Sequence, residues 1–277
     1  MQETAKEFLF RGKSIGFVPT MGALHEGHLS LVSRAKKEND KTIVSIFVNP
    51  LQFGPAEDYQ RYPRDTEGDK EKLIREEADI LFMPDASLMY PEGFSTLIEV
   101  GTISDKLCGA FRPGHFSGVV TVVSKLFHIT KPTRAYFGRK DYQQAVIIKK
   151  MVRELSMDID ISVCPTIREK DGLAMSSRNA YLTGAEREAA VVLYRSLEET
   201  AALIKSGIID LNKLRVTLSD SILREPAVTK LDYAGVYDPE TLDELQNIGG
   251  EALLAVAAWI GRTRLIDNIF VTMRNER

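Results

Sequence analysis

The chain has few cysteines and no strong excess of charge of either sign. Its only two cysteines, Cys108 and Cys164, lie far apart in a sequence of 277 residues. We therefore expect two reduced thiols in a cytoplasmic protein rather than a disulfide framework. The net charge is −3, and the sequence has no basic tail and no long run of like charges. This pattern argues against a nucleic acid or a membrane surface as a partner.

Long apolar runs are also missing. The segments "TIVSIFV" (42–48) and "ALLAVAAWI" (252–260) are far too short to cross a bilayer as helices. Residues 1–13 lack the apolar stretch of a signal peptide. The chain is long enough, and with 44% hydrophobic residues apolar enough, to bury the core of one large or two modest domains.

Strand and helix patterns alternate through the first part of the chain. A buried strand at 14–19, an apolar-periodic helix at 28–38 and a β-branched strand at 42–48 predict a βαβ unit. The same alternation predicts helices at 65–77, 117–129 and 141–155, and strands at 79–84, 95–100, 134–138 and 158–165. It indicates an α/β fold with a Rossmann-like, doubly wound parallel sheet, which binds ligands at the carboxyl ends of its strands.

The pattern changes after Pro165. Two amphipathic helices, at 184–206 and 210–223, precede three β segments at 230–238, 252–260 and 263–272. We therefore expect a Rossmann-like domain over residues 1–165 and a smaller α+β domain over residues 166–277.

The most informative stretch is "FVPTMGALHEGHLSLV" (17–32), in which His25 and His28 are three residues apart. A zinc-protease motif needs histidines four apart, and the sequence has no further Cys or His cluster to supply ligands. A phosphate-binding P-loop needs Lys and Ser or Thr where His28 and Leu29 stand. The two histidines therefore either belong to a helix-capping loop or take part in phosphate chemistry.

A strand-to-helix turn favours the second interpretation. Such a turn presents backbone N–H groups and the positive end of a helix to an anion. Gly27 would let a charged ligand approach the backbone closely, and Gly22 lies on the other side of the first histidine. Two imidazoles at this point can donate hydrogen bonds to phosphate oxygens. We name His28 as the proton donor because it lies nearest the start of the helix.

The His-x-Gly-His pattern resembles the nucleotide-binding motif of class I aminoacyl-tRNA synthetases and related nucleotidyltransferases. The longer string "PTMGALHEGHLSLV" resembles the pantothenate synthetase family within that superfamily. The resemblance continues, in order, through "VSIFVNPLQF", "YPRD", "RPGHFSGV", "FGRKDYQQ", "AMSSRNAYL" and "AAWIGRTRLIDN". It covers most of the chain.

This resemblance implies an enzyme, a pantoate–β-alanine ligase that uses ATP and forms a pantoyl-adenylate intermediate, releasing AMP and pyrophosphate. It also implies a homodimer, with Mg²⁺ bound mainly through the ATP phosphates and no metal ligands supplied by the protein. The expected catalytic residues are His28, His25, Lys140 and Arg178. The expected ATP-binding residues are Met21, Gly22, Ala23, Leu24, His25, Glu26, Gly27, His28, Gly138, Arg139, Lys140, Asp141, Ile167, Met175, Ser176, Ser177 and Arg178.

Neutral amides are expected to bind the two other substrates, since they suit hydroxyls and carbonyls. The resemblance assigns Gln52 to pantoate and β-alanine and Gln144 to pantoate, and Asn49 lies beside Gln52 in the same turn. At position 139 the family usually has glutamate, so the role of Arg139 is open.

Residues 174–178, "AMSSR", resemble the Lys-Met-Ser-Lys-Ser loop of the synthetases and are expected to close over ATP. Arg112 and His115 either face substrate carboxylates or brace a glycine-rich turn. Two other classes of protein stay open on the motif alone: a tRNA-charging enzyme and a nucleotide sensor without turnover.

Overall fold

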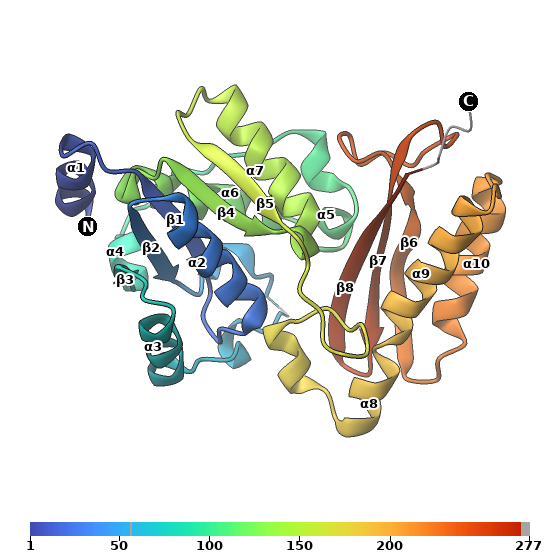
Figure 1. Cartoon of the computed structure of the whole chain (residues 1–277). Coiled ribbons are helices and arrows are strands. Elements are labelled where there is room, and N and C mark those ends of the chain that lie inside the picture. Colours follow the sequence, from blue (N-terminus) through green and yellow to red (C-terminus); the bar gives the residue numbers. More distant parts are fainter. Residues whose placement is uncertain (56, 273–277) are drawn as a thin grey trace. The chain divides into compact units, whose positions relative to one another are not determined.

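The computed structural model describes residues 1–55 and 57–272 of the chain (Figure 1). Within them the chain divides into two compact units. The first unit comprises Met1–Asp105 and Arg112–Ile167, and the second comprises Lys106–Phe111 and the described residues from Arg168 onward. A short internal segment therefore belongs to the second unit, although both of its flanks belong to the first.

A five-stranded parallel sheet forms the centre of the first unit, with strand order β3-β2-β1-β4-β5. The strands are β1 (Ile15–Thr20), β2 (Lys41–Ile46), β3 (Ile80–Phe82), β4 (Arg134–Gly138) and β5 (Asp160–Cys164). β1 lies in the middle, where Ile15, Phe17 and Val18 have no exposed surface. Strands covered on both faces need such continuous apolar runs. The predicted doubly wound parallel sheet is confirmed.

Helices before and between the strands of this sheet complete the first unit. They are α1 (Gln2–Phe10), α2 (Glu26–Glu38), α3 (Thr66–Arg75), α4 (Ala86–Met89), α6 (His115–Thr130) and α7 (Tyr142–Glu154), with single 3-10 turns η1 (Pro50–Gln52), η2 (Tyr59–Arg61), η3 (Thr102–Asp105) and η4 (Arg139–Asp141). Leu31, Val32 and Ala35 of α2 are buried against Val18 and Val44 of the sheet. This packing fixes the start of α2 at the carboxyl end of β1.

The sequence prediction was wrong at several points in this unit. Residues 95–100 form no strand. The Ile98 N–H instead donates to Thr121 Oγ1 over 3.0 Å, and the Ile98 carbonyl accepts from Ser117 Oγ over 3.0 Å. Ile98 thus satisfies both of its backbone groups on α6 instead of on a neighbouring strand. Helix α1 was not predicted, and α2 begins two residues earlier than expected.

The second unit contains a three-stranded antiparallel sheet of order β6-β7-β8. Its elements are β6 (Val228–Tyr237), β7 (Glu251–Ile260), β8 (Thr263–Thr272), α5 (Cys108–Phe111), η5 (Ser177–Tyr181), α8 (Gly184–Ala189), α9 (Val192–Lys205) and α10 (Leu211–Leu223). The helix predicted at 184–206 is divided into α8 and α9, because the helical ladder stops at Ala190. The predicted smaller α+β fold is otherwise confirmed.

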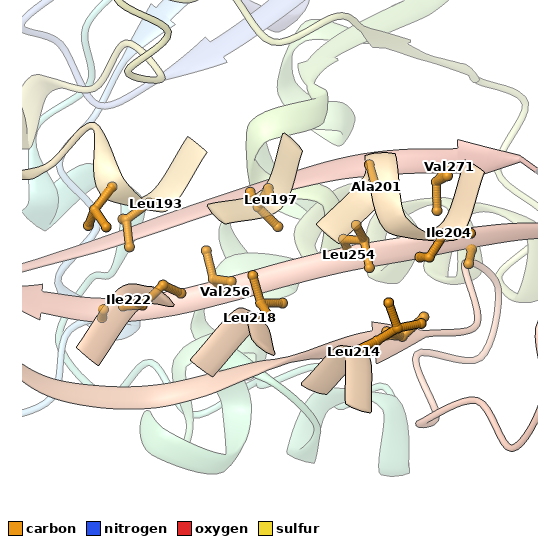
Figure 2. Packing of buried hydrophobic residues seen from close by; sticks show 14 of the residues in the cluster. Leu193, Leu197, Ala201, Ile204, Leu214, Leu218, Ile222, Leu254, Val256 and Val271 are labelled. Atoms are coloured by element: carbon orange, nitrogen blue, oxygen red, sulfur yellow. The ribbon is translucent and has the colours of Figure 1, made fainter. Parts of the chain in front are cut away.

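Two helices and the sheet share one core in this unit (Figure 2). Leu197 and Ile204 of α9, Leu214 of α10, and Leu254 and Val256 of β7 point into it. All five are at most 1% exposed. In the part of the chain that the structure describes, no helix has the length and apolar character needed to cross a membrane.

Candidate active site

A tight turn connects β1 to α2 and contains the two histidines. Gly22 has a φ of +84° and Ala23 a φ of +49°, so two consecutive residues adopt left-handed backbone conformations. A Cβ atom on Gly22 would lie 3.0 Å from Ile46 Cγ2 and 3.1 Å from Asp69 Oδ2, so the space there is tight, and the positive φ favours glycine.

His25 and His28 cap α2 reciprocally. The His28 Nδ1 accepts the backbone N–H of His25 at 3.3 Å, and the His25 Nδ1 accepts that of Gly27 at 3.1 Å. The ring centroids are 4.1 Å apart. Because each Nδ1 accepts a hydrogen bond, the proton of each neutral ring resides on Nε2. Capping and ligand binding are therefore compatible, since they use different nitrogens of the same rings.

His28 stays neutral in this environment. Burial, followed by the nearby His25, Lys140 and Lys72, lowers the pKa of His28 from 6.5 to about 3. A ring that is neutral near pH 7 donates a hydrogen bond through Nε2 but carries no spare proton to transfer. This argues against His28 as a proton donor and favours a hydrogen-bonding role. The charges of Lys140 and Lys72 contribute to this lowering, and Lys72 contacts the turn directly through the Leu24 carbonyl.

The backbone N–H groups of the turn are used within the protein, contrary to our expectation. The Ala23 and Leu24 N–H groups donate to the buried carboxylate of Asp69, over 2.8 and 2.7 Å. The Gly22 N–H donates to Thr20 Oγ1 over 3.2 Å. The His25 and Gly27 N–H groups are engaged in the cap, so five backbone donors of this turn already have partners within the protein.

The second expected phosphate-binding segment lies where β4 ends. Gly138 is the last residue of β4, and a Cβ atom there would meet nothing within 4 Å. Lys140 and Asp141 follow in η4, with 3.7 Å between Lys140 Nζ and Asp141 Oδ1, and Arg139 is exposed. Gln144 is half-buried in the first turn of α7. β4 is the direct neighbour of β1, so both segments lie at the same edge of the sheet.

A buried amide cluster occupies the turn after β2. The Asn49 Nδ2 donates to Gln52 Oε1 and to the Gly118 carbonyl, each over 3.0 Å, and Asn49 Oδ1 accepts from the Tyr90 hydroxyl at 2.7 Å. Asn49 is 1% exposed. Its amide is thus committed to internal contacts. Gln52 Nε2 contacts a weak acceptor, Met21 Sδ, at 3.2 Å.

Arg112 and His115 lie beside this cluster. Arg112 forms a two-fold hydrogen-bonded ion pair with Glu57, and His115 contacts the Gln52 carbonyl. Neither side chain was assigned a role by the sequence, and Glu57 was not singled out.

The Met175–Arg178 segment lies in the second unit. Ser176 caps η5 by accepting the Arg178 N–H at 3.3 Å. The hairpin before it is held by Glu169, which accepts from Asn179 Nδ2 at 3.1 Å and pairs with Arg187. Asn179 also donates to the Ala174 carbonyl over 3.1 Å. Hydrogen bonds and an ion pair therefore hold the residues on both sides of the segment.

Besides Glu57, three residues of the first unit were missed from the sequence: Lys72, Asp69 and Thr166. Lys72 donates to the Leu24 carbonyl over 2.8 Å, and Asp69 accepts from the same turn. Both stand in the charged helix α3, where they look like solvated surface residues. Thr166 precedes the half-buried Ile167 beyond β5, and its buried hydroxyl has no hydrogen-bond partner among the described residues.

Across residues 1–55 and 57–272, no group of three or more His, Cys, Asp or Glu side chains is arranged to hold a metal ion. Carboxylate oxygens are the ligands that Mg²⁺ prefers, and it commonly binds through one or two of them together with substrate phosphates.

Comparison with known proteins decides the family. The sequence profile of the family described as Pantoate-beta-alanine ligase matches residues 1–270. The chain belongs to this family. A pantothenate synthetase from Thermodesulfovibrio yellowstonii is 58% identical over 98% of this chain and 96% of its own length. One from Caldicellulosiruptor saccharolyticus is 53% identical over the same shares.

Solved structures agree with the pantoate-beta-alanine ligase assignment. A pantothenate synthetase from Thermus thermophilus is 46% identical, with a TM-score of 0.90 over 92% of each chain. A pantoate-beta-alanine ligase from Francisella tularensis, complexed with beta-gamma ATP and beta-alanine, is 40% identical, with a TM-score of 0.77 over 96% of this chain and 95% of its own. The predicted fold class, enzyme class and function as a pantoate–β-alanine ligase are confirmed.

Proposed function

We propose that this ligase works through a pantoyl adenylate. The carboxylate of pantoate attacks the α-phosphorus of ATP, and pyrophosphate leaves. The amine of β-alanine then attacks the acyl carbon, the amide C–N bond forms and AMP leaves. The observation that supports this chemistry is the pair of imidazoles, 4.1 Å apart at the carboxyl end of β1, with Lys72 bonded to the Leu24 carbonyl of the same turn and Lys140 just after the neighbouring strand β4.

In this proposal the neutral imidazoles donate hydrogen bonds from Nε2 to phosphate oxygens. Lys140 and Lys72 neutralise charge that builds up as pyrophosphate leaves. Such donors act more strongly on the transition state than on the bound substrate, which is the condition for catalysis. The reaction needs positioning and charge neutralisation and no nucleophile from the protein.

We place the nucleotide on residues 21–28, on Gly138, Arg139, Lys140 and Asp141, and near Ile167. We also assign to the nucleotide the hydroxyl of Thr166, which has no hydrogen-bond partner among the described residues. Met175, Ser176, Ser177 and Arg178 supply hydroxyls and a guanidinium that suit the triphosphate. Mg²⁺ is part of the nucleotide substrate, bound to its phosphates.

Pantoate is assigned to Gln52 and Gln144. Gln52 is 9% exposed, and its Nε2 can exchange the weak contact with Met21 for a substrate oxygen. Asn49, expected as a ligand, acts in this proposal by orienting the Gln52 amide through Oε1. β-Alanine is assigned to the same end of the sheet, next to Gln52.

A cytoplasmic homodimer completes the proposal. The two cysteines are free thiols, as is usual in a reducing compartment. The dimer rests on family resemblance alone, and sedimentation equilibrium of the purified chain tests it.

The test of the function is a co-substrate screen. The purified enzyme, ATP and Mg²⁺ are combined with pantoate alone, with pantoate and β-alanine, and with other acid–amine pairs, and AMP, pyrophosphate exchange and product are followed. We expect pantoate-dependent ATP–pyrophosphate exchange without β-alanine, and pantothenate and AMP with it. A nucleotide sensor gives no exchange, and a tRNA-charging enzyme needs tRNA for its product. Either result contradicts the proposal.

A further inference from the structure

The guanidinium group of Arg112 contacts other residues of the first unit. Its Nε donates to Glu57 Oε1 over 2.7 Å and its Nη2 to Glu57 Oε2 over 2.6 Å. Its Nη1 contacts His115 Nε2 at 2.9 Å, and Nη2 also lies 3.4 Å from the Gln52 carbonyl. All three nitrogens of the guanidinium are engaged by protein atoms. Arg112 is therefore arranged to hold protein groups, and the alternative that it faces a substrate carboxylate loses its support.

His115 transmits this arrangement to Gln52. Its Nδ1 lies 2.8 Å from the Gln52 carbonyl oxygen, which can only accept, so Nδ1 carries the proton. Its Nε2 faces an arginine N–H, which can only donate, so Nε2 accepts. The two partners together select one neutral tautomer of His115 and fix the plane of its ring.

The Gln52 turn is restrained from the other side by α6. A Cβ atom on Gly118 would lie 2.3 Å from the Leu51 carbonyl oxygen, so only glycine lets the helix approach this closely. Asn49 bridges the Gly118 carbonyl and Gln52 Oε1. Gln52 is thus fixed at its backbone by His115 and at its side chain by Asn49, and its Nε2 is left directed at Met21.

We propose that Glu57, Arg112 and His115 form a positioning chain that holds the Gln52 carbonyl and thereby orients the Gln52 amide towards pantoate. None of the three touches the substrate. The side chains of the ion pair are 13% and 25% exposed, so water competes weakly with the contact. The inference rests on the proposed binding of pantoate at Gln52 and deepens it by naming the residues that set its specificity.

The test uses two His115 variants. One keeps the hydrogen bond to the Gln52 carbonyl, and the other keeps the contact with Arg112. In His115→Asn the amide nitrogen occupies the position of Nδ1 and can still donate to the Gln52 carbonyl. In His115→Gln the amide reaches the position of Nε2, next to Arg112, and that donation is lost. Arg112→Lys and Glu57→Gln remove the two-fold pairing. KM for pantoate and for ATP, kcat, and melting temperature are measured for each variant and the parent.

We expect His115→Gln, Arg112→Lys and Glu57→Gln to raise the KM for pantoate about 3- to 10-fold, the equivalent of about one hydrogen bond. The KM for ATP should stay within about 2-fold. His115→Asn should raise the KM for pantoate less than His115→Gln does, because it keeps the donor to the Gln52 carbonyl and loses only the contact with Arg112. In a Gln52→Ala background, His115→Gln should change the KM for pantoate no further, because the amide that it orients is gone.

Equal increases in both KM values, an unchanged KM for pantoate, or an undiminished effect of His115→Gln in the Gln52→Ala background would each overturn the positioning chain. Failure of the proposed function looks different. The parent enzyme would then form no pantothenate from pantoate, ATP and β-alanine, whatever its variants did.

Discussion

The backbone N–H of Leu24 donates to Asp69 Oδ1 across 2.7 Å, and this contact ties the histidine turn to helix α3. Asp69 is 1% exposed and accepts from Ala23 as well. An asparagine there would present an N–H₂ group to one of the two backbone donors. We expect Asp69→Asn to lower the free energy of unfolding by about 1–3 kcal/mol, because a buried donor loses its acceptor.

The same substitution should also reduce pantoate-dependent ATP–pyrophosphate exchange, because the turn that carries His25 and His28 is released. Asp65→Asn is the matched control. It removes a charge from the start of α3, where Asp65 caps Gly68, without touching the turn. Denaturant unfolding and exchange are measured for both. Similar behaviour of the two variants would contradict a role of Asp69 in the turn.

His28→Asn separates capping from catalysis. The asparagine Oδ1 can replace Nδ1 as acceptor for the His25 N–H, whereas the Nε2–H donor is lost. We expect the rate of exchange to fall about 10²- to 10³-fold, the usual cost of one transition-state donor. In His28→Ala the rate of exchange should fall by a similar factor. The free energy of unfolding should also fall by about 1 kcal/mol, since the cap is lost. Normal exchange in His28→Asn would assign the residue to capping alone.

The lowered pKa of His28 predicts how stability depends on pH. In the unfolded chain a histidine titrates near pH 6.5, whereas His28 in the fold titrates near 3. Between these values the unfolded state binds a proton that the folded state does not. The contribution of neutral His28 is therefore fully present above about pH 6.5 and is lost progressively as the pH falls.

Melting curves from about pH 8 to about pH 4 test this linkage. Below about pH 6.5 the melting temperature of the parent should fall more steeply with pH than that of His28→Asn, which has no group to titrate at this position. Parallel curves would show that His28 titrates normally in the folded protein.

Two adjacent glutamines of α7 should differ in their effects. Gln144 is half-buried at the expected pantoate site, while Gln143 is 6% exposed and donates to the Ile103 carbonyl over 3.1 Å. Gln144→Ala should weaken pantoate binding and leave ATP binding nearly unchanged, because a neutral amide adds little to triphosphate affinity. Gln143→Ala should lower the melting temperature instead. Calorimetry with each ligand decides, and equal losses of both affinities in Gln144→Ala would refute the assignment.

Hydrogen exchange in the Met175–Arg178 segment should respond to ATP more strongly than exchange in the preceding residues 168–174. Glu169, Asn179 and Arg187 already hold the flanking residues through hydrogen bonds and an ion pair. We expect hydrogen exchange at 175–178 to slow when nucleotide is added, with little change at 168–174. Arg187→Ala should raise hydrogen exchange at residues 168–174 when ATP is absent. Unchanged protection at 175–178 would indicate a static loop.

The sequence predicted the elements of the fold better than the contacts of the site. The run at 42–48 and the helix after the histidines could be read locally, because burial on both faces of a sheet leaves an apolar run. Residues 95–100 have equally strand-like character, but the backbone of Ile98 bonds to Ser117 and Thr121, which no local pattern reveals. Helix α1 has Ala5 as its only buried residue, so its amphipathic signal is weak.

Long-range burial explains the residues that were missed. Asp69 stands among charged neighbours in "TEGDKEK", and only its position under the β1–α2 turn makes it a buried acceptor. The same applies to Glu57, whose pKa lies below its ordinary value: burial acts to raise it, but the hydrogen bonds and charge of Arg112 outweigh burial. A charged residue on a surface-like segment shows its role only once the segment has been placed in space.

The segment Lys106–Phe111 has a consequence for how this protein can be divided or recombined. Its Cys108 Sγ lies 3.2 Å from the Tyr233 hydroxyl, and its Lys106 Nζ donates to the Thr241 carbonyl over 2.7 Å. The chain passes between the two units at residues 105–106, 111–112 and 167–168. A single crossover near residue 167 therefore joins a second unit from one parent to a Lys106–Phe111 segment from the other. Chimaeras between relatives keep these contacts only when the segment is inherited together with β6 and the following residues up to Thr241.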